Sequence, residues 1–157
     1  MGSTTFSGPV TSKAGFIMGT DVNSTLTASA TITQETYNGQ IINLSAAAGM
    51  TITLPAATGT NAMYRFVVST SVTSNSYKVQ VANATDVMVG TGSVAGTTGT
   101  AFATLPASDT LTMNGTTQGG LAGSYVEIID IAAGIFVVRA NLLGSGTVIT
   151  PFSAAVS

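Results

Sequence analysis

This sequence contains no cysteine, no histidine and no tryptophan, and it carries very little charge. Without cysteine there is no disulfide framework, no thiolate zinc site and no cysteine nucleophile. Without histidine the usual base of a serine hydrolase is missing. Charged side chains make up 6% of the 157 residues, whereas an ordinary soluble domain has about 25%. Catalysis, metal binding and nucleic-acid contact draw on these scarce residue types, so the composition indicates structural material.

The few charges are spread along the chain, and their sum is slightly negative. The four basic residues, Lys13, Arg65, Lys78 and Arg139, lie far apart in the sequence, and the formal net charge is −2. Because binding to a phosphate backbone needs clustered lysine and arginine, we expect no nucleic-acid partner. A membrane helix needs about 20 predominantly apolar residues. No such run is present, so we expect no membrane partner either.

Much of the chain shows the alternation of apolar and polar residues that half-buried strands have. Leu26, Ala28, Ala30 and Ile32 alternate with serine and threonine, and this period of two predicts a strand. A later strand must end at Pro55, because proline cannot donate to a strand ladder. By the same criteria we predict strands at 40–44, 50–54, 63–68, 77–81, 101–105 and 111–113.

Turn residues separate the predicted strands. Residues 38–39 and 114–115 are asparagine–glycine pairs, which favour tight hairpin turns. The strongest hairpin signal joins 125–131 to 135–139. The stretch 90–100 is rich in Gly, Thr and Ser, and it indicates a long loop or a weak edge.

These patterns predict an all-β fold, either a sandwich or a barrel of jelly-roll type. No segment of ten or more residues has helical spacing, and fixed-period repeats are absent, which argues against a solenoid. We expect one domain over residues 21–157, preceded by an extended arm over residues 1–20. The arm is rich in small residues and carries isolated apolar anchors at Phe6, Pro9, Val10, Phe16 and Ile17.

Three carboxylates, Asp109, Glu127 and Asp130, are the candidates for a glycosidase pair. On one strand Glu127 and Asp130 differ by an odd number of residues, so they point to opposite faces and cannot form a local pair. Serine–lysine chemistry would need Lys13 or Lys78 buried with a lowered pKa, and a solvated lysine is the ordinary case. The sequence therefore predicts a protein that is not an enzyme.

Other ligand and binding patterns are equally weak. Asp86 near Asn83 is typical of a turn, and no run of alternating Asp or Asn indicates a calcium loop. Thr-x-Thr pairs such as Thr51 and Thr53 lack the regular spacing of an ice-binding array, so they indicate the polar faces of amphipathic strands. We expect no metal and no other cofactor.

Several blocks of the sequence resemble the virion structural proteins of tailed bacteriophages. The first block is Gly39-Gln-Ile-Ile-Asn-Leu44 followed by Met50-Thr-Ile-Thr-Leu-Pro-Ala-Ala-Thr-Gly59. In those proteins a strand ends in Leu-Pro-Ala-x-x-Gly and a Tyr/Arg/Phe/Val-Val strand follows, here at 64–68. The resemblance covers most of the chain, because similar blocks also occur at 5–11, 79–88, 120–131, 136–139, 144–147 and 150–153.

The resemblance implies a phage structural protein, most like a capsid decoration or cement protein. Such proteins are non-enzymatic and bind the outer head surface as homotrimers that stabilise contacts between capsid subunits. The major capsid protein is then the expected partner, and the phage head surface is the expected location. The arm suits capsid contact through Phe6, Pro9, Val10, Phe16 and Ile17. Head-fibre or tail-fibre receptor-binding modules are the alternative, but the chain lacks the long shaft of a complete fibre.

Overall fold

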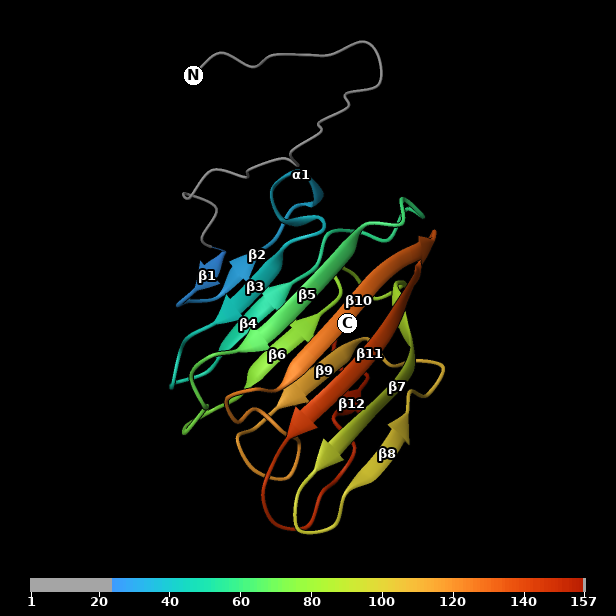
Figure 1. The fold of residues 1–157 in the computed structure, drawn as a ribbon. Helices are drawn as coiled ribbons and strands as arrows, with labels where there is room; N and C mark the ends of the chain where they lie inside the picture. Colours follow the sequence, from blue (N-terminus) through green and yellow to red (C-terminus); the bar gives the residue numbers. More distant parts are fainter. Residues whose placement is uncertain (1–23, 157) are drawn as a thin grey trace, which may run out of the picture.

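A computed structural model describes residues 24–156, which form two β-sheets packed face to face and one short helix (Figure 1). The predicted arm and its five apolar anchors lie outside the described residues. In chain order the elements are β1 (Thr25–Leu26), β2 (Ala30–Thr31), α1 (Gln34–Tyr37), β3 (Ile41–Leu44), β4 (Met50–Thr53), β5 (Met63–Val68), β6 (Tyr77–Gln80), β7 (Val87–Ala95), β8 (Thr100–Ala103), β9 (Thr110–Met113), β10 (Tyr125–Ala132), β11 (Ile135–Leu143) and β12 (Phe152–Ser153).

The two sheets form a sandwich, and the all-β prediction is confirmed. Sheet A has seven strands in the order β1-β3-β5-β10-β11-β7-β8, and sheet B has five in the order β12-β9-β6-β4-β2. Both sheets are open, so the fold is a sandwich and not a closed barrel. Alternate residues of each strand point inward and form one buried cluster between the sheets. Its members include Ile42, Phe66 and Val138 from sheet A, and Ile52 and Val79 from sheet B.

The first six strands wind as a short parallel coil, which the sequence did not predict. Strands β1, β3 and β5 are parallel neighbours in sheet A, while β2, β4 and β6 are parallel neighbours in sheet B. Thr25 pairs with Asn43, and Asn43 pairs with Val67, so successive turns of the coil differ in length. The chain as a whole is a sandwich and not a solenoid, as predicted, although the sequence did not predict this local winding. Unequal turns leave no fixed period, and the parallel pairs are not those of an antiparallel jelly roll.

Both asparagine–glycine pairs form turns, but neither makes a hairpin. Gly39 and Gly115 have φ values of 74° and 80°, which glycine adopts without strain. Each turn leads from a strand of sheet B to a strand of sheet A, from β2 through α1 to β3 and from β9 to β10. Thr33 caps α1, since its hydroxyl accepts a hydrogen bond from the Thr36 amide at 3.3 Å.

The C-terminal hairpin is confirmed, and it organises the centre of sheet A. Strands β10 and β11 pair antiparallel with a bulge between Asp130 and Ala132. Strand β11 also pairs in parallel with β7 along nine residues, from Val87 to Ala95. The expectation of a loop or weak edge at 90–100 is therefore wrong for 90–95. Small residues carry no pattern of their own, and the long partner strand supplies the pairing.

Gly90 is placed where no side chain fits. Its φ of +148° belongs to the region that glycine favours, and an added Cβ would overlap the carbonyl oxygen of Val138 on β11. A side chain here would push two paired strands apart in the middle of sheet A.

We predict that Gly90→Ala lowers the free energy of unfolding by about 3 kcal/mol, through backbone strain and loss of the β7–β11 pairing. Chemical denaturation followed by circular dichroism measures the change. Gly99→Ala is the control, because the nearest atom to a Cβ at Gly99 is 3.9 Å away, and its stability should stay near that of the parent chain. Equal stability of the two variants would contradict the assignment.

Candidate interaction surface

The outer face of sheet A carries an apolar row that crosses four strands. Met63 on β5, Ile129 on β10, Val137 on β11 and Val89 on β7 lie side by side in register. Val89 is 36% exposed, and the other three are partly exposed. We call these four residues the apolar row. Contiguous exposed apolar surface is common at sites of contact with other molecules, so this face is the candidate interaction surface.

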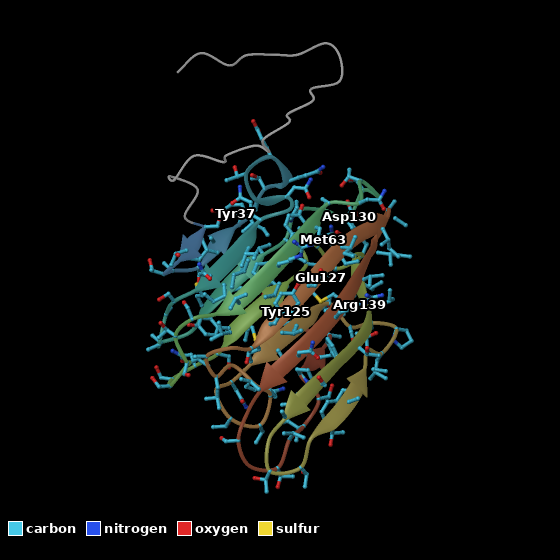
Figure 2. The ribbon with its side chains drawn as sticks, viewed as in Figure 1. Tyr37, Met63, Tyr125, Glu127, Asp130 and Arg139 are labelled. Atoms are coloured by element: carbon cyan, nitrogen blue, oxygen red, sulfur yellow. The ribbon has the colours of Figure 1, made fainter. Side chains whose placement is uncertain are left out.

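A charged row runs next to the apolar row on the same face. It consists of Arg65 on β5, Glu127 on β10 and Arg139 on β11, again in register. Nε of Arg65 lies 3.2 Å from Oε2 of Glu127, and the Tyr125 hydroxyl lies 3.3 Å from the same oxygen, to which it donates. Arg139 is exposed, and within residues 24–156 it has no ion-pair partner. Figure 2 shows Glu127 and Arg139 on neighbouring strands of this face.

The ion pair between Arg65 and Glu127 contributes little to stability. Their side chains are 35% and 19% exposed, and partly solvated pairs contribute about 0.5 kcal/mol. The pKa of Tyr125 is raised, first by burial and then by the charge of Glu127 and the hydrogen bond to it. Arg65 opposes this rise. The charged row is therefore better suited to orienting a partner than to holding the fold together.

The outer face of sheet B has a different character. Its strands present hydroxyl and amide groups at Thr51, Thr53, Gln80 and Thr112, together with the exposed Lys78. Thr51 and Thr53 therefore lie on a polar strand face, as predicted, whereas Thr110 of another such pair is buried. Because this face has no apolar row, sheet A offers the surface that gains more from being covered.

The structure separates the carboxylates that were candidates for catalysis. Glu127 lies on the outer face of sheet A, whereas Asp130 is buried, so the prediction that they point to opposite faces is confirmed. Asp109 is also buried, and it accepts hydrogen bonds from the amides of Ala155 and Val156 at 2.8 Å and 3.2 Å. Asp109 therefore holds the C-terminal segment against the sandwich.

Asp86 and Asn83 form a turn, as predicted. Oδ1 of Asn83 accepts from the amides of Thr85 and Asp86 at 2.9 Å and 3.0 Å. Oδ2 of Asp86 accepts from the Asn83 side-chain amide at 3.0 Å and from the Ala57 backbone amide at 2.9 Å. The buried carboxylate thus fixes this turn to the segment that follows β4.

Asp130 binds a whole loop through one carboxylate. It is 3% exposed, and its oxygens accept from the amides of Gly59 at 2.7 Å, Thr58 at 3.1 Å and Thr60 at 3.1 Å. The Thr60 hydroxyl adds a bond of 2.9 Å. Burial by itself raises the pKa of Asp130, but the hydrogen bonds from Gly59, Thr60 and Thr58 outweigh burial and hold the pKa below its usual range.

The sequence did not predict the apolar row or the charged row, although adjacent apolar residues on two strands indicated that both faces of sheet A carry apolar side chains. Strands β10 and β11 carry adjacent apolar residues at Ile128-Ile129 and Val137-Val138. Apolar side chains on both faces of a strand are typical of a sheet that is covered on both sides. The register that aligns these residues with Met63 and Val89 is visible only in the structure.

No protein-family model, no curated protein and no solved structure matches this chain. No helix within the described residues is long and apolar enough to cross a membrane. In residues 24–156 no three side chains of His, Cys, Asp or Glu are grouped as a metal site would need. Function is therefore inferred from the sequence pattern and from the outer face of sheet A.

We predict that Asp130→Asn destabilises the protein by about 3 kcal/mol at pH 7, because three backbone amides lose the buried anionic acceptor that they share. The folded-state pKa of Asp130 is lowered, so its contribution is present above the unfolded-state pKa of about 3.9 and is lost as pH falls through the folded value. Denaturant titrations between neutral and acidic pH measure both effects.

The control for this experiment is Glu35→Gln, the same change of carboxylate to amide on the exposed surface of α1. Its stability should follow that of the parent chain at every pH. The Asp130→Asn variant should lose less stability in acid than the parent chain does. Parallel pH curves for all three proteins would show that Asp130 does not bind the loop as a carboxylate.

Proposed function

We propose that this chain is a non-enzymatic structural protein of a phage particle, which decorates the capsid and stabilises contacts between its subunits. The observation that carries the proposal is the apolar row with its neighbouring charged row on sheet A. A face of this composition is suited to being covered by protein. The resemblance to phage virion proteins supplies the kind of assembly, with the major capsid protein as partner and the outer head surface as location.

The use of the buried carboxylates supports a structural role. Asp86, Asp109 and Asp130 each accept hydrogen bonds from backbone amides of a distant segment. A general acid or base must be free to exchange a proton with a substrate. These three carboxylates instead hold loops to the sandwich, which favours a rigid subunit of an assembly.

The first described residue of the chain lies at an open sheet edge. Residue 24 directly precedes β1, which is an edge strand of sheet A, and β2 is an edge strand of sheet B. An extended segment that starts at such an edge is suited to adding to a sheet of another protein or docking in its grooves. This placement supports the arm as the tether to the capsid, with the outer face of sheet A as a further surface for contact with a neighbouring subunit of the particle.

The alternative is a head-fibre or tail-fibre module, and the parallel coil of β1 to β6 favours it. A coil of parallel strands grows by adding turns at its open end, which is how elongated β proteins are built. Such a module would bind a receptor on the host cell instead of the capsid.

We predict that the intact chain sediments with phage heads stripped of decoration protein, and that a chain lacking residues 2–20 stays in the supernatant. The reason is that the arm carries the apolar anchors. A second variant with Phe6, Val10 and Phe16 changed to Ser keeps the length of the arm and tests the anchors alone. Circular dichroism confirms that each protein is folded.

Binding of neither version to heads would contradict the proposal, and binding of the intact chain to host cells would then identify the fibre module. Binding of both versions would show that the arm is not the tether.

A further inference from the structure

The outer face of sheet A has a charge pattern that complements itself. In the charged row, Glu127 lies between Arg65 and Arg139, which are its direct neighbours on the two adjacent strands. Arg65 is paired with Glu127, whereas Arg139 has no ion-pair partner within residues 24–156. Glu127 is the acidic residue of this row, so the same face provides both a free cation and a carboxylate beside it.

We propose that a second copy of this chain covers the outer face of sheet A, with the charged row of one copy against the charged row of the other. The two copies are related by a two-fold axis that lies between the two faces and runs parallel to the strands. Rotation about such an axis leaves each residue at the same height along the strands. The charged row therefore meets the charged row of the next copy, and the apolar row meets the apolar row.

The register of the central hairpin makes this arrangement favourable. Glu127 is the direct partner of Arg139 between β10 and β11, and Ile129 is the partner of Val137. An axis between β10 and β11 exchanges the positions of these two strands. Glu127 of each copy then faces Arg139 of the other, and Ile129 faces Val137. Two reciprocal ion pairs flanked by apolar contacts are the pattern expected of an interface between identical subunits.

A two-fold axis perpendicular to the strands is unfavourable, and so is the outer face of sheet B. An axis that runs along the charged row would place Glu127 against Glu127 and Arg139 against Arg139, and like charges at an interface repel. On sheet B the exposed cation is Lys78, which has no carboxylate beside it in its strand pairs with Thr51 and Thr112. The requirement that opposite charges of the two copies meet therefore selects the outer face of sheet A and a two-fold axis parallel to its strands.

The small residues beyond Arg139 leave room for a contact. Thr91, Ser93, Ala101 and Asn141 surround Arg139 in an open hollow on this face. A guanidinium with short neighbours can turn toward a carboxylate of another chain without displacing its surroundings. The inference goes beyond capsid binding and does not depend on it.

The test is sedimentation velocity of the full chain over a range of concentrations. We expect the parent chain to self-associate and Arg139→Glu to weaken association by about tenfold or more, because it replaces an attraction by a repulsion. The double variant Glu127→Arg with Arg139→Glu should restore association, since the reversed charges face each other again. Adding Arg65→Glu to it keeps an ion pair between positions 65 and 127, where the double variant alone has two like charges. Lys78→Glu is the matched control, because it makes the same change of charge on the outer face of sheet B and should have no effect.

A variant in the apolar row tests the other half of the interface. Val89→Asp changes an exposed side chain, so the fold should survive, as thermal unfolding would confirm, while association should weaken. A two-fold interface closes with two chains, so two chains per particle are expected from it. A particle of three chains without a stable pair would overturn this interface and would instead match the trimer that the resemblance to decoration proteins implies.

A parent chain that is monomeric at about 1 mM, where even weak interfaces form, would overturn the proposal. Association that is unchanged by Arg139→Glu, or not restored by the double variant, would overturn it as well. Capsid sedimentation is a separate measurement. A self-associating chain that ignores phage heads would reject the decoration role and leave this interface standing.

Discussion

The fold depends on burying one face of each sheet against the other. The chain has few aromatic residues, and the largest fully buried side chains are Tyr64, Tyr77, Phe66 and Phe136. Most other core positions are Val, Ile, Leu and Met, so the contact between the sheets comes from many aliphatic side chains packed closely together. At Gly92 on β7 the absence of a side chain makes room for the ring of Phe152 on β12 of the other sheet, which would lie 3.1 Å from an added Cβ.

The scarcity of charge has a structural consequence that composition alone does not reveal. Three of the six acidic residues, Asp86, Asp109 and Asp130, are buried. Each binds backbone amides of a segment far away in sequence, and no buried side-chain nitrogen or oxygen of the described residues lacks a partner. Half of the acidic side chains thus lie inside the molecule, where a carboxylate that accepts several hydrogen bonds can fix a loop.

The outer faces of the two sheets differ in polarity. Sheet B presents hydroxyl groups and one lysine, and it suits contact with water. Sheet A presents an apolar row next to alternating charges, and it suits contact with protein. A decoration protein needs such a division, because it must join other subunits of the particle while part of its surface stays solvated.

The amino-acid pattern by itself determined the class of fold, the positions of most strands and the central hairpin. The single strand predicted from Leu26 to Ile32 is wrong, because the chain bends there and forms β1 and β2 in different sheets. Period-two alternation depends on neighbours along one strand, so it can be recognised without knowing what lies beside that strand. It also determined that Glu127 and Asp130 face opposite sides. The stretch 90–95 was missed because glycine, serine and threonine carry no alternation, and its strand exists through pairing with β11.

Only the tertiary structure decided the winding of β1 to β6, the loop bound by Asp130 and the alignment of Met63, Ile129, Val137 and Val89. All three depend on residues that are distant in sequence and adjacent in space. Strand order and register are set by the burial of whole faces, which is a property of the folded chain as a unit. The physical reason is that the alternation of residues along one strand determines which face of that strand is apolar, whereas strand pairing determines which residues of other strands lie beside that face.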